Sequence, residues 1–173
     1  WKFMYDYRQG DQIGLLNAIV TLFGGDPVNW LAVKPIINTL MLLIVFIWTQ
    51  TGFAMVILSA AIKAVPAEQL EAAQLDGTSA WQRFTNVTVP GIRSSLIVVL
   101  TTITIASLKV YDIVAVMTGG RDDTTVLGFE MVNQQQRFQS YGHSSALAVV
   151  LFIFVLPLII YNARSMRKQR EIR

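Results

Sequence analysis

Cysteine is absent from the 173 residues, and histidine occurs once, as His143. Without cysteine the sequence offers no disulfide framework, no thiol nucleophile and no cysteine-based metal site. A single histidine likewise excludes a histidine cluster that could hold a metal. Charged residues are also scarce, at 14% of the chain, against about 25% in an average soluble domain. The composition therefore predicts no metal site, and it is unlike that of an ordinary water-exposed domain.

The missing charges are concentrated in long apolar runs. No Asp, Glu, Lys or Arg occurs from Pro35 to Ile62, from Ser94 to Leu108, or from Phe138 to Ala163, the last of which contains His143. A helix of about 20 apolar residues crosses the roughly 30 Å hydrocarbon core of a bilayer. Stretches such as "LMLLIVFIW" also lack the polar face that a helix of a soluble domain shows every 3.6 residues. We therefore expect an all-α membrane protein with about three transmembrane helices, the middle one tolerating Lys109 and Asp112 near its outer end.

The distribution of basic residues predicts the orientation of these helices. Basic residues are concentrated after the last run, in "ARSMRKQREIR", and in the connector, at Lys63, Arg83 and Arg93. The positive-inside rule places both in the cytoplasm. The predicted segments are 1–34, extracytoplasmic or interfacial; 35–62, transmembrane; 63–90, a cytoplasmic loop; 91–118, transmembrane; 119–142, an extracytoplasmic loop; 143–164, transmembrane; and 165–173, a basic cytoplasmic tail.

The part that precedes the first apolar run has a different character. Residues 14–24, "GLLNAIVTLFG", are too few to span a bilayer and predict an amphipathic or interfacial helix, which ends at the turn-forming "GGDPVNW". Trp30 then lies where an aromatic residue would meet the outer interface. The opening "WKFMYDYRQG" resembles the exit of an earlier membrane helix, so we expect a longer protein.

The connector is long and polar, and it predicts two short helices. Pro66 and Glu68 suit a helix start, and Gly77 suits its end. Thr78 or Ser79 would cap a second helix that carries Trp81 and Phe84 on one face, and Pro90 would mark the entry to the next span. Isolated helices of this length are marginal in water, and the acids of the first helix do not suit an anionic lipid surface. The pattern therefore favours docking into a groove of a partner protein.

The residues of this connector carry a resemblance to a known family. Glu71-Ala72-Ala73, then Gly77, then Val87, Val89 and Pro90 resemble the cytoplasmic loop signature of permease subunits of binding-protein-dependent ABC importers. That signature reads E-A-A, three residues, G, nine residues, then I-x-L-P. The segments "DPVNWL", "VYDIVAVMTGG" and "YGHSSALAVVLFIFVLPLIIYNAR" resemble the carbohydrate-uptake branch, especially α-glucoside and maltose-type permeases. The outer loop departs from the family, with "GGRDD" where "GGP" is common.

The resemblance implies a fold, a function and a set of partners. The connector would be a coupling helix that docks on a separate ATPase, through Glu71, Ala72, Ala73, Asp76, Gly77 and Pro90. The implied partners are an ABC ATPase dimer, a second permease subunit, an extracytoplasmic sugar-binding protein and membrane lipids, all at a bacterial inner membrane. The chain itself would hold no cofactor, because ATP and Mg²⁺ would bind to the ATPase. The pI of about 9.4 arises largely from the basic tail and needs no nucleic acid to explain it.

Helical spacing suggests residues that could line a sugar pathway. Phe46, Gln50 and Phe53 fall on one face of the first span, and Thr102 and Lys109 repeat the spacing in the second. Aromatic rings and an amide suit a sugar, but the phenylalanines could equally pack between helices. Lys109 could line the pathway together with Asp112, or it could extend outward and pair with Asp112 alone.

Two other classes of protein compete with the importer. A secondary transporter driven by an ion gradient would need carboxylates in the membrane, for which Asp112 is the only candidate. A membrane-embedded enzyme would need clustered His, Asp or Glu, and the sequence shows none, so no catalytic residue is predicted. The glycine-rich "GGRDDTT" lacks the phosphate-loop pattern, and any ATPase would therefore be another polypeptide.

Overall fold

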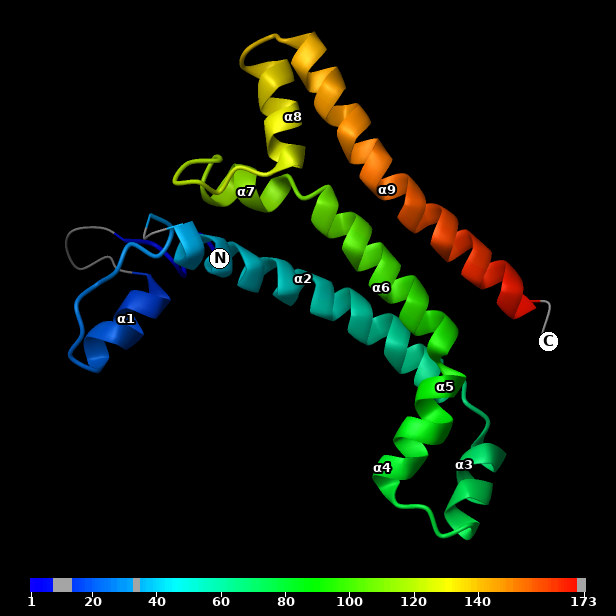
Figure 1. Ribbon diagram of the computed structural model, residues 1–173. Coiled ribbons are helices and arrows are strands. Elements are labelled where there is room, and N and C mark those ends of the chain that lie inside the picture. Colours follow the sequence, from blue (N-terminus) through cyan, green and yellow to red (C-terminus); the bar gives the residue numbers. More distant parts are fainter. Residues whose placement is uncertain (8–13, 33–34, 171–173) are drawn as a thin grey trace. The chain divides into compact units, whose positions relative to one another are not determined.

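The computed structural model of the chain describes residues 1–7, 14–32 and 35–170. In this described part the regular secondary structure is helical throughout, without a strand (Figure 1). The elements are α1 (Leu15–Leu22), α2 (Pro35–Lys63), α3 (Ala67–Leu75), α4 (Ala80–Arg83), the π-helix η1 (Phe84–Thr88), α5 (Val89–Gly91), α6 (Arg93–Leu108), α7 (Asp112–Met117), α8 (Leu127–Gln136) and α9 (Tyr141–Arg170).

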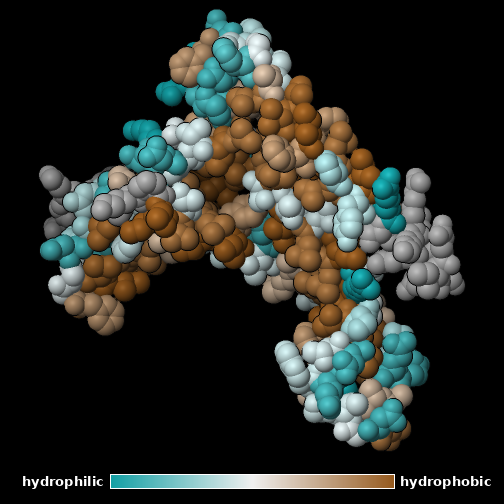
Figure 2. Space-filling model, viewed as in Figure 1, coloured by the Kyte–Doolittle hydropathy of each residue, from teal (hydrophilic) through white to brown (hydrophobic). Residues whose placement is uncertain are grey.

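Two helices are long and apolar enough to cross a membrane. They cover Ile36–Lys63, with 28 residues, and Tyr141–Arg164, with 24 residues. These ranges agree closely with the expected spans 35–62 and 143–164. Large apolar side chains such as Ile36, Trp48 and Phe152 are exposed on them, and Figure 2 shows hydrophobic surface along both helices. α9 continues as a helix to Arg170, through most of the expected tail, of which residues 171–173 lie outside the described part.

The expected span 91–118 differs from the observed structure. α6 ends at Leu108 after 16 residues, which is about 24 Å of helix at 1.5 Å per residue and short of the hydrocarbon core. Tyr111 has non-helical backbone angles, and α7 begins only at Asp112. At the other end, residues Ala80–Gly91 precede α6 with a bend of 71°, and by length and composition alone this bent pair has the character of a broken span or of a re-entrant loop. The helix break at 109–111 was not expected from the sequence.

The chain divides into two compact units. One consists of Trp1–Thr49 with Leu108–Phe152, and the other of Gln50–Ser107 with Ile153–Arg173. α2 and α9 each contribute residues to both units. The first unit therefore contains α1, α7 and α8, and the second contains α3 to α5 and α6 up to Ser107.

The core of the first unit is small, and the partly buried aromatic residues Trp1, Trp30 and Phe129 pack against it. Tyr5, Leu42, Val45, Val114 and Met117 form the buried cluster. The Tyr5 hydroxyl donates to the carbonyl of Met41 at 3.2 Å. Burial raises the pKa of this hydroxyl above its usual value, because a phenolate would lose its hydration. The contact attaches the N-terminal residues to α2.

A buried amide also fixes α2 to the loop after α7. Asn38 is 1% exposed, and its Nδ2 donates to the carbonyl of Asp122. Asp122 and Asp123 both have positive φ, at 55° and 59°, a conformation that costs non-glycine residues energy. The Asn38 contact stabilises this turn, which contains the "GGRDD" that departs from the common family pattern.

α1 carries one fully buried side chain, which connects it to the loop that follows. Asn17 is 0% exposed, and its Nδ2 donates to the carbonyls of Asp6 and Val28, both at 3.0 Å. Its Oδ1 accepts from the backbone N–H of Val28 and from Nε1 of Trp30, both at 2.9 Å. The amide thus uses both donors and both lone pairs. This network fixes Trp30 and the loop 24–30 against α1, whose interfacial position remains a prediction.

Candidate functional site

The connector between α2 and α6, here called the α3–α4 hairpin (residues 66–91), folds as two short helices. α3 is composed of strong helix formers, "AEQLEAAQL". Pro66 is its N-cap and α3 begins at Ala67, so the proline precedes the first turn, and Glu68 lies within that turn. The negative charge of Glu68 complements the positive end of the helix dipole. The expected start of this helix is therefore observed to within one residue.

The end of α3 is a Schellman motif centred on Gly77. Gly77 has φ +76°, and its N–H donates to the carbonyl of Gln74 at 3.1 Å. The N–H of Thr78 donates to the carbonyl of Ala73 at 3.3 Å, and the Thr78 hydroxyl donates to the same carbonyl at 2.6 Å. A side chain at Gly77 would meet nothing within 4 Å. The glycine is therefore required by its left-handed backbone and not by lack of space.

α4 begins with a capping box. The N–H of Gln82 donates to Oγ of Ser79 at 3.3 Å, and the N–H of Ser79 donates to Oε1 of Gln82 at 2.8 Å. Of the two expected caps, Ser79 is the one observed. The rings of Trp81 and Phe84 lie 5.7 Å apart between centroids, as their spacing predicts.

The hairpin returns to α2 through a π-helix. η1 and α5 continue α4 to Gly91, and a Cβ at Gly91 would lie 3.3 Å from Cγ2 of Val65. Thr88 and Ile92 are buried at this crossing. Single π turns inside helices occur frequently at functional sites. The two ends of the hairpin therefore lie close together, near the end of α2 and the start of α6.

The tip of the hairpin presents an exposed surface that contains most of the expected interface residues. Glu71, Ala72, Asp76 and Gly77 are exposed and Ala73 is half-buried, while Pro90 is exposed in α5 nearer the base. Leu75 is 89% exposed and Trp81 is 71% exposed, although both are large apolar side chains. Figure 1 shows α3 alongside α4, and Figure 2 shows a largely hydrophilic surface here with few hydrophobic patches. Acids around isolated apolar anchors are suited to contact a protein groove.

The expected pathway residues lie on three helices and in the break between two of them. Phe46, Gln50 and Phe53 occupy successive turns of α2, and Thr102 is exposed on α6. Lys109 lies in the break after α6 and therefore does not continue a helical face from Thr102. Asp112 is the first residue of α7, and both charged side chains are exposed. No ion pair joins Lys109 to Asp112, both of which lie in the described part of the chain.

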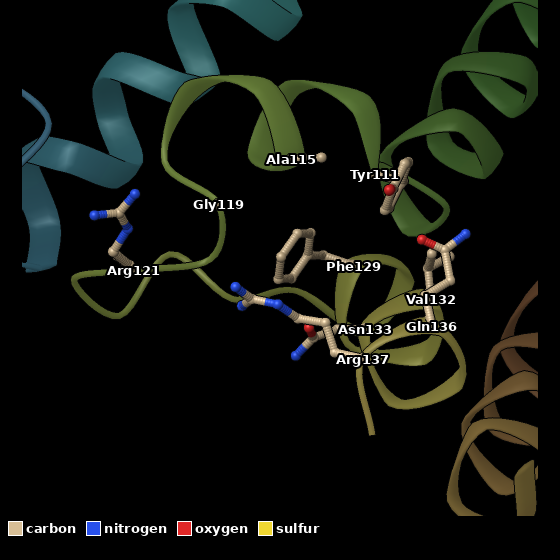
Figure 3. A pocket seen from close by; sticks show the side chains of 9 residues that line it. All are labelled: Tyr111, Ala115, Gly119, Arg121, Phe129, Val132, Asn133, Gln136 and Arg137. Atoms are coloured by element: carbon tan, nitrogen blue, oxygen red, sulfur yellow. The ribbon is translucent and has the colours of Figure 1, made fainter. Parts of the chain in front are cut away.

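Sequence reasoning did not identify α8, nor the pocket that it forms with α7. The pocket has a volume of about 450 Å³. Its lining residues are Tyr111, Ala115, Gly119, Arg121, Phe129, Val132, Asn133, Gln136 and Arg137 (Figure 3). The helix-forming composition of "LGFEMVNQQQ" was the signal that could have revealed α8. The pocket itself depends on how α8 packs, which no local pattern indicates.

Comparison with known proteins identifies the family. The family described as "Binding-protein-dependent transport system inner membrane component" matches residues 13–170. The chain belongs to this family. Its members are transport components of the inner membrane, as the connector signature predicted. Membership does not support the ion-coupled alternative.

Two curated relatives resemble the permease chain over nearly its whole length. It is 47% identical over 175 residues to the osmoprotective compounds uptake permease protein of Synechocystis sp., covering 100% of the chain and 62% of that relative. It is also 47% identical over 172 residues to the alpha-glucoside transport system permease protein of Rhizobium meliloti, covering 98% of the chain and 51% of the relative. The chain thus spans about half to three-fifths of the length of these relatives.

A solved structure confirms the all-α permease fold. A chain of a bacterial ABC transporter involved in the import of the acidic polysaccharide alginate superposes with a TM-score of 0.80 at 20% identity. The match covers 96% of this permease chain and 57% of that chain. At this identity the comparison bears on the fold alone.

Proposed function

We propose that the protein is a membrane-spanning permease subunit of a bacterial ABC importer for sugars, most similar in cargo to α-glucoside systems. The chain supplies part of the translocation pathway and performs no chemistry of its own. The observation that carries the proposal is the α3–α4 hairpin. It combines the family signature at Glu71, Ala72, Ala73 and Gly77 with an exposed, structured tip that includes Leu75 and Trp81.

The hairpin would work as a mechanical coupling element. Its tip docks in a cleft of a separate ATPase on the cytoplasmic side, with the alanines allowing close approach and Glu71 reaching a basic or donor group. Motion of the ATPase is then transmitted through the base of the hairpin, where Gly91 packs against Val65. Closure of the ATPase dimer on ATP would in this way reorient α2 and α6.

The proposed assembly contains further subunits. A second permease subunit completes the pathway, and an extracytoplasmic sugar-binding protein delivers the cargo. ATP and Mg²⁺ bind to the ATPase dimer, and this chain requires no cofactor. The location is the bacterial inner membrane. The cargo assignment is supported by the alpha-glucoside permease of Rhizobium meliloti at 47% identity.

Co-purification and uptake test the proposal together. The full-length protein would be expressed with its partner subunits, and uptake of labelled maltose, trehalose and sucrose would be measured. Glu71→Lys combined with Gly77→Pro should abolish ATPase co-purification and reduce uptake by about tenfold or more, because the lysine reverses the charge at the interface and proline cannot adopt the positive φ of Gly77. Gln69→Ala, an exposed change on the same helix outside the signature, is the matched control and should leave both unchanged. Full uptake in the double variant, or no ATPase bound to the unaltered protein, would refute the proposal.

The pathway residues give a second readout. Gln50→Ala should impair uptake while the ATPase still co-purifies, because the change lies outside the hairpin. The same pathway would include Phe46, Phe53 and Thr102, together with Lys109 in the helix break and Asp112 at the start of α7. Unchanged uptake kinetics in both Gln50→Ala and Lys109→Ala would remove these residues from the pathway without affecting the coupling proposal.

A further inference from the structure

The pocket between α7 and α8 is a candidate ligand site outside the pathway residues proposed above. Both helices and the loop that joins them belong to the first compact unit. The volume of about 450 Å³ lies within the range of about 300–1,000 Å³ that is typical of small-molecule sites. Its walls combine aromatic, amide and guanidinium side chains.

The aromatic floor of the pocket is held rigidly. The ring of Phe129 stacks on Tyr111 with centroids 6.0 Å apart and planes at 19°. On the Gly120 side there is no room even for a methyl group, since a Cβ at Gly120 would lie 2.3 Å from Cε1 of Phe129. α8 itself packs closely on the break after α6, where a Cβ at Gly128 would lie 2.7 Å from the carbonyl oxygen of Val110. Figure 3 shows the Phe129 ring projecting from α8 toward Ala115 and Gly119.

The loop that closes the pocket is also braced. The hydroxyls of Thr118 and Thr124 lie 2.6 Å apart, and the Thr124 hydroxyl donates to the carbonyl of Arg121 at 2.6 Å. The Thr125 hydroxyl donates to the carbonyl of Gly120 at 2.7 Å. A site that is already ordered loses little conformational entropy when a ligand binds.

The polar groups of the pocket provide both hydrogen-bond donors and acceptors. Asn133 uses its Nδ2 to donate to Oε2 of Glu130 at 3.3 Å, which leaves its Oδ1 as an acceptor. Glu130 is also occupied by Nε2 of Gln134 at 2.6 Å, and it does not line the pocket. Within the described part of the chain, the side chains of Gln136 and Arg137 have no hydrogen-bond partner. Gln136 can both donate and accept, and Arg137 offers a planar set of donors.

This combination fits a saccharide better than a simple anion. Each sugar hydroxyl donates and accepts, and the C–H face of a sugar ring packs on an aromatic surface. A free anion would use only the donors and would leave the aromatic floor and the amide oxygens without a role. We propose that the α7–α8 pocket binds one or two sugar units of the imported saccharide, as a site distinct from Phe46, Gln50 and Phe53. The proposal rests on the proposed function, because it takes the cargo to be a sugar.

Single cysteines test the site directly, since these 173 residues contain none. Both Gln135 and Gln136 are exposed, but only Gln136 lines the pocket. Gln136→Cys would therefore place a thiol at the pocket, and Gln135→Cys would place one on the neighbouring residue outside it. Both are made in the full-length protein with other cysteines replaced, and the assembled transporter is purified in nanodiscs. The labelling rate by a charged thiol reagent is then measured with and without whichever of maltose, trehalose or sucrose is taken up best. That disaccharide should slow labelling at 136 by about threefold or more and leave 135 unchanged, because it binds only inside the pocket.

Uptake kinetics give an independent measurement. Gln136→Ala and Arg137→Gln should raise KM for the same disaccharide by about threefold or more, which is the loss expected for one hydrogen bond to a bound ligand. Gln135→Ala should match the unaltered protein. Equal labelling rates with and without the disaccharide, in a transporter that takes it up, would overturn the site and leave the proposed function standing. Protection at 136 by potassium phosphate but not by the disaccharide would also overturn it, as an anion site. Absence of uptake of all three sugars would instead refute the proposed function.

Discussion

Gly77 shows how much of the candidate site depends on one residue. Its φ of +76° is favourable for glycine, whereas an L-residue with a Cβ pays about 1–2 kcal/mol. No atom lies within 4 Å of a Cβ added there, so the cost comes from the backbone alone. The bend between α3 and α4 therefore becomes less stable when any ordinary side chain is introduced.

Substitution of this glycine gives the first prediction. Gly77→Ala should weaken the hairpin by about 1 kcal/mol and reduce maltose-stimulated ATPase activity of the assembled transporter severalfold. Gly77→Asn should retain more activity, because asparagine tolerates the left-handed region. Gly142→Ala, at a glycine with neither a positive φ nor a close neighbour, is the matched control. Equal activity of Gly77→Ala and Gly142→Ala would show that the bend does not limit coupling.

Asn17 gives a second prediction, on stability. Asn17→Ala would leave the indole N–H of Trp30, the N–H of Val28 and two carbonyls without their partner. Each buried group left unsatisfied costs about 1–3 kcal/mol, so the loss should reach about 3 kcal/mol or more. A clear fall in the melting temperature of the full-length protein in detergent is expected. Asn29→Ala, on an exposed residue of the same loop, should leave the melting temperature within about 1 °C. A melting temperature unchanged by Asn17→Ala would mean that the network does not stabilise the fold.

At the scale of elements, sequence patterns predicted the helices that form for local reasons. The runs 35–62 and 143–164 are apolar on every face, and α2 and α9 follow them closely. The hairpin was predicted equally well, because a glycine end, a serine cap and strong helix formers act within a few residues. Each of these signals requires no knowledge of the rest of the fold.

The elements that depend on tertiary contact were not predicted. The helix break at Lys109, Val110 and Tyr111 coincides with the place where Gly128 brings α8 against the backbone. The sequence analysis predicted an extracytoplasmic loop over 119–142, whereas residues Leu127–Gln136 form α8. The pocket was missed for the same reason: Tyr111 and Phe129 are distant in sequence, and only the packing of α8 brings their rings together.

The capping box of α4 supports a prediction at this scale. Ser79→Ala removes the acceptor for the N–H of Gln82 and should destabilise the helix N-terminus by about 1 kcal/mol. Amide hydrogen exchange of residues 80–84 in the full-length protein should then accelerate about fivefold. Ser79→Asp keeps a cap oxygen and should retain slow exchange. If both variants exchange at the rate of the unaltered protein, the cap does not determine the stability of α4.

At the scale of the whole molecule, the charge distribution and the apolar spans together determine a topology. Lys63 and Arg93 flank the hairpin, Arg83 lies within it at the end of α4, and "ARSMRKQR" ends α9. The segment from α7 to the start of α9 has fewer basic residues, with Asp122, Asp123 and Glu130 beside Arg121 and Arg137. Because basic residues are retained in the cytoplasm during insertion, the hairpin and the end of α9 should lie inside, and the α7–α8 pocket outside.

Cysteine accessibility tests this arrangement in a single experiment. Gln69→Cys on α3 and Gln135→Cys on α8 would be introduced separately into the full-length protein, with other cysteines replaced. In intact spheroplasts, a membrane-impermeant thiol reagent should label position 135 and not 69, and in inside-out vesicles the preference should reverse. The background protein without cysteine measures unspecific labelling, and uptake confirms that each variant is assembled. Labelling of both positions from the same side would contradict the topology. The pocket would then lie on the same side of the membrane as the hairpin. That is not the side at which a sugar enters, because the importer mechanism requires the hairpin and the entry site to face opposite compartments.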